Sequence, residues 1–250
     1  MKFSSWRALL FFHFIWLLPI TSNSQNVLKY DGIAMQSTRV IYPESAQKGV
    51  AFKVTNYSNM AYLLQSQVTE PNASGQKKPD FIVLPPLEKV NEKDSVVLMI
   101  KAINHKMPKD RESLFTLNIR AIPNQKKEEG NAARSQIIIA TQNHLKLFYR
   151  PDGLPKYSDD EISKKLVFYR DKGRLVVKNP TPYYVTFDSI KVGNNIIDPS
   201  SLFEMVPPMG QQQYPLPENT TGELIWTLID RDGGVTQQYT SELSLFSSLY

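Results

Sequence analysis

The sequence predicts an all-β protein made of two antiparallel sandwiches in series. Its dominant hydrophobic period is two, the pattern of strands that bury one face and expose the other. Groups of Gly, Pro, Asn and Asp recur about every ten residues, which is the spacing of turns in sandwich folds. No stretch carries a long amphipathic helix. Residues 158–165 are expected to form one short helical turn at most, with Ser158 capping the acids that follow it.

Individual strands follow from this alternation along the chain. Apolar side chains occupy every second position in residues 50–55 and 115–120, and residues 238–245 show the same alternation with Ser241 at one of these positions. Residues 96–100 and 136–140 are instead nearly continuous apolar runs, which are typical of strands covered on both faces or lying at a binding edge. The polar residues 124–134 are expected to form a loop between two strands.

The chain is long enough to hold two domains. Its 250 residues suit one large domain or two of about 100–130 residues, each with its own core. Two prolines and a glycine fall within residues 151–155, and such a composition resists regular structure. The sequence therefore predicts a first domain at residues 25–151 and a second at residues 152–250.

Residues 1–24 have the pattern of a secretory signal peptide. Lys2 and Arg7 precede an apolar stretch over residues 8–20, and small residues follow it. The alternative is a membrane anchor, but this stretch is shorter than the roughly 20 residues that a spanning helix needs. Cleavage would leave 27 basic and 24 acidic residues, a net charge of +3. We therefore expect a secreted protein with neither a nucleic-acid partner nor a stable membrane insertion.

The chemistry of most enzymes is missing. The chain has no cysteine, which excludes disulfides, thiol nucleophiles and Cys-ligated metals. After cleavage only His105 and His144 remain as histidines, and there is no Gly-rich phosphate loop or Gly-x-Ser-x-Gly motif. We expect no catalytic activity, no metal and no cofactor. A two-domain β hydrolase using paired carboxylates stays open, although no spacing singles them out.

One long segment resembles a known family. Residues 107–123 read Met-Pro-Lys-Asp-Arg-Glu-Ser-Leu-Phe-Thr-Leu-Asn-Ile-Arg-Ala-Ile-Pro, which is similar to the signature of the periplasmic pilus (fimbrial) chaperones of the chaperone–usher pathway. Further similar pieces occur in order along both proposed domains, at residues 37–43, 81–87, 146–151 and 179–187.

The resemblance implies a fold and a function. The fold would be two immunoglobulin-like sandwiches in an L-shaped arrangement, with a cleft between them. Such chaperones cap pilus subunits whose own sandwich lacks a strand, by lending an edge strand, and deliver them to an outer-membrane usher without ATP. The missing cysteine and the moderate loop before the donor strand resemble the short-loop branch, which serves rod-like pili with tip adhesins. Donor edges of two free copies are also expected to pair in a self-capping dimer.

The donor strand would lie in residues 136–142. Ile137, Ile139 and Thr141 share one face there and would enter the groove of the subunit. Thr141 is less apolar than the family usually shows at this position. Without the resemblance, the two isoleucines would be interpreted as core residues of an ordinary buried strand.

Arg39 and Lys146 match the pair that anchors the subunit's C-terminal carboxylate in this family. A guanidinium and an ammonium suit such an anion. Alternation places Lys146 on the opposite face from Ile137 and Ile139, so a bulge or an edge facing the cleft is needed. Without the resemblance, solvated or acid-paired cations would be the simpler interpretation.

Arg150 matches a position in an inter-domain ion-pair network, which needs an acid from the second domain. The usual aspartate position of the family holds Arg231, so Asp230 or Asp232 would substitute. The functional alternative is a secreted immunoglobulin-like adhesion or matrix module without chaperone activity, in which these residues only build the scaffold.

Overall fold

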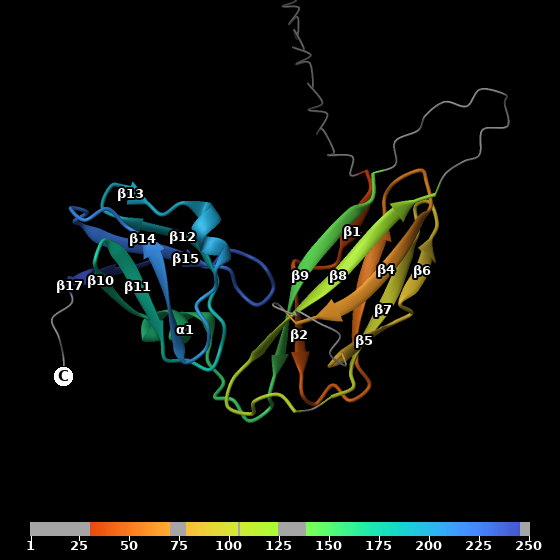
Figure 1. Cartoon of the computed structure of the whole chain (residues 1–250), viewed down its shortest axis with the longest axis horizontal. Coiled ribbons are helices and arrows are strands. Elements are labelled where there is room, and N and C mark those ends of the chain that lie inside the picture. The colour runs from red at the N-terminus through yellow and green to blue at the C-terminus, as the bar shows by residue number, and fades with distance from the viewer. Residues whose placement is uncertain (1–30, 71–78, 105, 125–138, 246–250) are drawn as a thin grey trace, which may run out of the picture. The chain divides into compact units, whose positions relative to one another are not determined.

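The computed structural model describes residues 31–70, 79–104, 106–124 and 139–245 (Figure 1). The predicted signal at 1–24, most of the predicted loop at 124–134, and Ile137 lie outside these residues. The described residues all belong to one compact unit. None of the described helices is long and apolar enough to cross a membrane.

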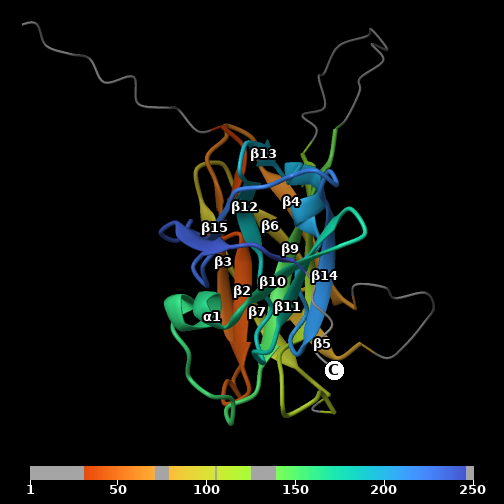
Figure 2. The same ribbon diagram turned by 90° about the vertical axis from the view of Figure 1, so that its left-hand side faces the viewer.

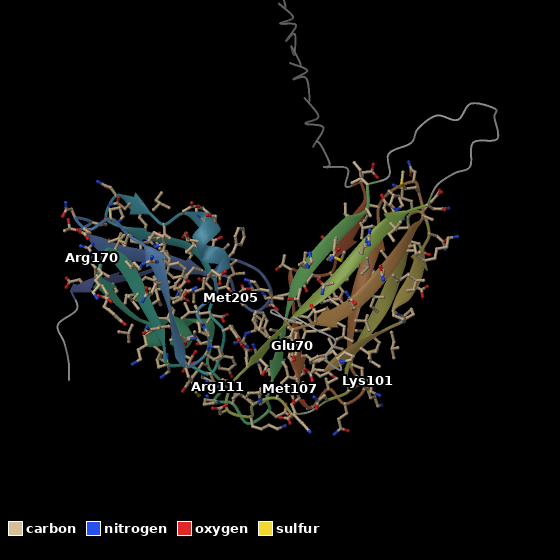
Figure 3. All side chains as sticks on the ribbon, viewed as in Figure 1. Glu70, Lys101, Met107, Arg111, Arg170 and Met205 are labelled. Atoms are coloured by element: carbon tan, nitrogen blue, oxygen red, sulfur yellow. The ribbon has the colours of Figure 1, made fainter. Side chains whose placement is uncertain are left out.

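The first half of the described chain forms two sheets around one core. Four strands make one sheet in the order β1 (Ile33–Met35), β3 (Val50–Asn56), β7 (Ser95–Ala102) and β5 (Phe81–Leu84). Five make the other in the order β2 (Arg39–Pro43), β9 (Thr141–Arg150), β8 (Ser113–Pro123), β4 (Tyr62–Thr69) and β6 (Leu87–Val90). Side chains of both sheets meet in the core, and Met107 of the loop before β8 joins them (Figure 3).

The second half repeats this plan around a separate core. One sheet has the order β14 (Gly210–Pro215), β11 (Arg174–Asn179), β10 (Val167–Asp171) and β17 (Ser244–Leu245). The other has the order β13 (Asn195–Ile196), β12 (Phe187–Val192), β15 (Glu223–Leu228) and β16 (Tyr239–Glu242). A short helix, α1 (Asp159–Lys165), and a 3-10 helix, η1 (Pro199–Phe203), complete this half. The predicted all-β fold is confirmed, and the boundary at residue 151 stays a prediction.

Three local predictions need correction. Residues 238–245 do not form one strand, because β16 and β17 belong to different sheets with Leu243 packed on the core between them. The apolar run 96–100 is covered on one face only, since Val97 is 57% exposed although β7 lies in the middle of its sheet. Helix α1 spans seven residues, about two turns rather than one. Its predicted cap is confirmed, because Ser158 and Glu161 form a reciprocal capping box.

β9 is the element that positions the functional residues. It pairs with β8 along its whole length, from Thr141 opposite Ala121 to Tyr149 opposite Ser113, without a shift in register. On its other side β2 runs parallel to it, but only from Lys146 onward (Figure 1, Figure 2). Among the described strands, residues 141–145 therefore have a neighbour on one side only, which leaves an open sheet edge.

Candidate functional site

Arg39 and Lys146, the two residues of the predicted anchor, lie side by side. The parallel pairing of β2 and β9 makes them Cα partners, although they are distant in the sequence. Both side chains are half-buried, and neither has an ion pair within the described residues. Arg39 Nη1 donates a 3.3 Å hydrogen bond to the carbonyl of Ile229, whereas its Nε is buried without a partner. The pair thus retains donors for an anion.

The electrostatics of this pair favour a bound anion. Burial lowers the pKa of Lys146, and the neighbouring charge of Arg39 lowers it further, with Glu204 opposing both. Burial also lowers the pKa of Arg39, against the weaker opposing effects of Asp230, Glu112 and Asp159. Both charged forms are therefore disfavoured in the free protein, and an arriving carboxylate would relieve that cost.

The unbroken register of β8 and β9 explains how Lys146 can lie opposite the predicted donor face. Leu145, Leu147 and Tyr149 pack in the core of the first sandwich, so Lys146 lies on the other face, as side chains alternate along a strand. On that face the Phe148 ring lies 5.7 Å from the ring of Tyr184 in the second sandwich. The strand needs no bulge in its described part, because its other face is turned to the second sandwich.

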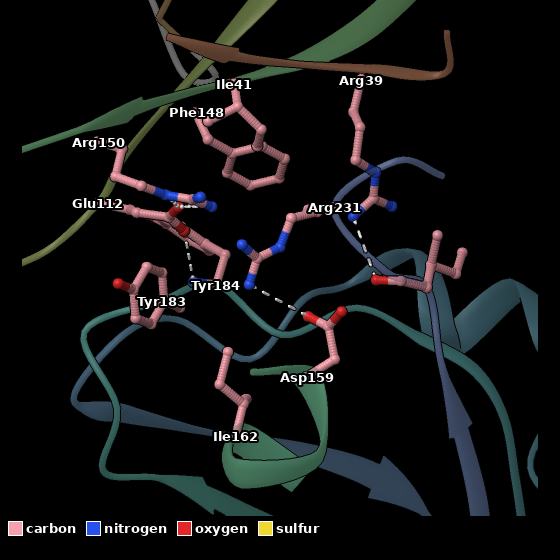
Figure 4. A pocket seen from close by; sticks show the side chains of 11 residues that line it. Arg39, Ile41, Glu112, Phe148, Arg150, Asp159, Ile162, Tyr183, Tyr184 and Arg231 are labelled. Atoms are coloured by element: carbon pink, nitrogen blue, oxygen red, sulfur yellow. Dashed lines mark hydrogen bonds and ion pairs between the residues drawn. The ribbon is translucent and has the colours of Figure 1, made fainter. Parts of the chain in front are cut away.

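A pocket opens between elements of the two sandwiches next to Arg39 (Figure 4). Three arginines and two acids line it, together with apolar and aromatic side chains; the charged residues are Arg39, Glu112, Arg150, Asp159 and Arg231. The Arg39 guanidinium also lies 5.8 Å above the Phe148 ring, a cation–π contact. Polar and aromatic side chains therefore line the pocket, and four of its five charges form the pairs Arg150–Glu112 and Arg231–Asp159.

Arg150 has a partner that the sequence interpretation missed. Its Nη2 lies 2.7 Å and its Nε 2.8 Å from Oε1 of Glu112, whose side chain is only 2% exposed. The other oxygen of Glu112 accepts a 2.9 Å hydrogen bond from the backbone N–H of Tyr184 in the second sandwich. Burial raises the pKa of Glu112, and Arg150 and this N–H oppose the rise. The pair links the sandwiches through a backbone group rather than through an acid of the second domain.

The predicted partners of Arg150 are engaged elsewhere. The Asp230 carboxylate accepts the N–H groups of Asp232 and Gly234 in its own turn, and the ion pairs of the described residues join neither aspartate to Arg150. Arg231 turns toward helix α1, 3.9 Å from Asp159. Glu112 lies opposite Arg150 because Ser113 pairs with Tyr149, and no local pattern in the sequence shows this register.

The predicted donor residues lie at the open edge where the structure describes them. Thr141 begins β9 and is exposed, and Ile139 precedes the strand with 75% of its surface exposed. The interpretation of Ile139 as a core residue is therefore wrong. The strand itself is described from Thr141 onward, and Ile137 is outside the described residues.

Two sandwiches in series, with an open strand edge beside two cations that form no ion pair within the described residues, have the geometry expected of a strand-lending chaperone. Residues 32–155 match the family described as pili and flagellar-assembly chaperone, PapD N-terminal domain. Residues 161–240 match pili assembly chaperone PapD, C-terminal domain. The chain belongs to this family of pilus-assembly chaperones, which is not an enzyme family, and the adhesion-module alternative is set aside.

Similar proteins agree with this assignment. Chaperone protein FocC of Escherichia coli is 38% identical over 212 residues, which cover 84% of this chain and 89% of the relative. Chaperone protein FimC of Escherichia coli K12 is 36% identical over 84% of this chain and 83% of the relative.

Solved structures show the same fold. A chain in the complex of the Salmonella enterica SafA pilin with the SafB chaperone has a TM-score of 0.74 and 29% identity, covering 86% of this chain and 98% of that one. The periplasmic chaperone SfaE has a TM-score of 0.67 and 35% identity, covering 85% of this chain and all of that one. The predicted family and the two immunoglobulin-like domains are thereby confirmed.

Proposed function

We propose that the chain caps a pilus subunit by lending it the open edge of β9, and holds the subunit's C-terminal carboxylate between Arg39 and Lys146. One observation carries this proposal: the unpaired cations lie where the open edge of residues 141–145 ends and the pairing of β9 with β2 begins. The SafA pilin–SafB chaperone complex among the similar structures supports a pilus subunit as the partner.

The open edge can supply what an incomplete sandwich lacks. Residues 141–145 have backbone N–H and C=O groups that face no described strand on one side, and a strand of the subunit could pair with them. Ile139 and Thr141 have the same parity as the core residue Leu145, and with Ile137 they would extend the apolar face of β9 into the subunit's groove. Thr141 contributes the least apolar surface of these three contacts.

The anchor would set the register of that pairing. A terminal carboxylate can accept hydrogen bonds from both the guanidinium of Arg39 and the ammonium of Lys146, which are Cα partners across β2 and β9. Hydrogen bonds to charged groups contribute about 1.5–3 kcal/mol each. Because the anchor lies at one end of the open edge, fixing the subunit's last residue there also fixes which residues pair along the strand.

With this function, we expect the protein to act in the periplasm. Residues 1–24 would direct export and be removed, and the capped subunit would pass to an outer-membrane usher. The donor edges of two free copies would pair with each other until a subunit arrives. No metal or cofactor takes part, since strand pairing and burial supply the free energy of binding.

The test captures cargo from the periplasm of the native host. We expect the tagged wild type to recover a small β-rich subunit, identified by mass spectrometry, and Ile139→Asp to lose most of it. The aspartate would place a charge in the apolar groove of the subunit, which is costly without a partner.

Ile196→Asp is the matched control. Ile196 is 70% exposed on β13 of the second sandwich, almost as exposed as Ile139 at 75%, so the two changes have a similar effect on solubility. Equal recovery by both variants, or no pilus subunit with wild type, would contradict the proposal.

A further inference from the structure

The turn at residues 229–234, which connects β15 to β16, is a rigid structure built on Asp230. The backbone N–H of Asp230 donates to the carbonyl of Gly234 at 2.8 Å. Its carboxylate accepts the N–H groups of Asp232 at 2.9 Å and of Gly234 at 2.8 Å. Ile229 and Val235 close the turn as a β-bridge. The conformation of the turn is thus determined by its own hydrogen bonds.

The outer side of this turn is fixed to the second sandwich. Arg231 Nη2 donates a 3.1 Å hydrogen bond to the carbonyl of Tyr157 and lies 3.9 Å from Asp159 at the start of α1. The bridge at Ile229 continues directly from the end of β15. The Arg231 contacts and the bridge at Ile229 therefore fix the turn to the second sandwich.

The turn lies against Thr38, the residue that immediately precedes β2. A Cβ atom added to Gly233 would lie 2.3 Å from Oγ1 of Thr38, and Gly233 has a φ of +91°. Only glycine combines this conformation with such a close approach. In the same turn, the Ile229 carbonyl lies 3.3 Å from Arg39 Nη1 (Figure 4).

This carbonyl makes the one hydrogen bond that the described structure gives the Arg39 guanidinium. Because the guanidinium is planar, holding Nη1 also restricts the direction of its remaining N–H donors. Asp230 directly follows Ile229 in the sequence. Its carboxylate accepts hydrogen bonds inside the turn and forms no ion pair with Arg39 among the described residues. The turn orients the cation, and the charge of Asp230 acts on Arg39 without an ion pair among the described residues.

We propose that the turn at residues 229–234 of the second sandwich positions Arg39 for the cargo's carboxylate, with Gly233 as the residue that permits the contact. The inference rests on the proposed function and assigns the second sandwich a part in the anchor. The two sandwiches then form a single binding site, because one supplies the cations and the other orients one of them.

The test measures the binding of a synthetic peptide with the sequence of the captured subunit's C-terminal segment, as the free acid and as the C-terminal amide. Gly233→Ala is expected to weaken binding of the free acid about tenfold and to leave the amide unchanged. Thr38 is exposed. Thr38→Leu enlarges the side chain that faces Gly233, so it should displace the turn and also weaken binding of the free acid alone. A merely structural defect would weaken both peptides equally.

A rescue variant isolates the contact. Thr38→Ala removes the Oγ1 atom that the new methyl group would meet, so Thr38→Ala/Gly233→Ala should recover part of the free-acid affinity. If both Gly233→Ala and Thr38→Leu keep the full preference for the free acid, the proposal is wrong. If Arg39→Ala also keeps that preference, the proposed anchor is wrong, and so is the inference that depends on it. The Arg39→Ala result therefore distinguishes a failure of the inference from a failure of the proposed function.

Discussion

Replacing Arg150 with Met is expected to destabilise the free protein by about 3–5 kcal/mol, the usual cost of leaving a buried charge without its partner. The carboxylate of Glu112 is almost fully buried and would retain only the N–H of Tyr184. Burial already raises the pKa of Glu112 in the presence of Arg150. Removal of the cation would raise this pKa further, because Arg150 opposes the rise. Unfolding by urea measures the loss directly.

The loss should depend on pH in a defined direction. A carboxyl group whose folded-state pKa is raised binds more protons in the folded state than in the unfolded state. Stability is therefore lost as pH rises from the unfolded pKa through the folded one. Because the pKa of Glu112 is raised, in Arg150→Met we expect a small defect at about pH 4 and a larger one at about pH 8.

Two controls distinguish this pair from an ordinary surface pair. Arg111 pairs with Asp110 at 2.7 Å on the surface, and Arg111→Met should have little effect because water screens that pair. Glu112→Gln/Arg150→Met should recover most of the stability, since no buried charge then remains. A defect in Arg150→Met no larger than that of Arg111→Met at both pH values would contradict the account.

Removing either anchor cation is expected to weaken binding of the captured subunit roughly 10- to 150-fold, the equivalent of about 1.5–3 kcal/mol. The double variant Arg39→Ala/Lys146→Ala should lose less than the product of the two single losses, because both cations contact one anion. Arg39→Lys should lie in between, since an ammonium keeps the charge but not the planar array of donors. Calorimetric titration of the purified subunit gives each affinity.

Arg174→Ala and Lys178→Ala are the matched controls for the anchor. Both residues are exposed on β11 of the second sandwich, so each substitution removes the same charge from the protein. We expect wild-type affinity for both. Equal losses in the control and anchor variants would mean that net charge, not the site, determines binding.

The fold was predictable because its strands bury one face. Phe52 and Val54 of β3, and Phe115, Leu117 and Ile119 of β8, are buried at every second position, as the alternation predicts. The division of residues 239–245 between two sheets was not predictable in this way. It depends on tertiary packing around Leu243 and not on local hydrophobic pattern.

The site was predictable only through the resemblance. No local pattern brings Arg39 next to Lys146, because their contact results from a parallel pairing of strands that are far apart in the sequence. The same reason explains the missed partner of Arg150. Glu112 belongs to the segment that carries the resemblance, but its role depends on the register of β8 and β9. Burial and the contact at Gly233 likewise need the folded structure.

The central claim is that the open edge of β9 pairs with a strand of the subunit, and hydrogen exchange of backbone amides tests it most directly. Exchange is compared between the free chaperone, diluted until it is monomeric, and its complex with the captured subunit. We predict that binding slows alternate amides within residues 141–145, whereas those of residues 147–149 change little because they already lie between β2 and β8. Unchanged exchange at residues 141–145 in a saturated complex would contradict the account.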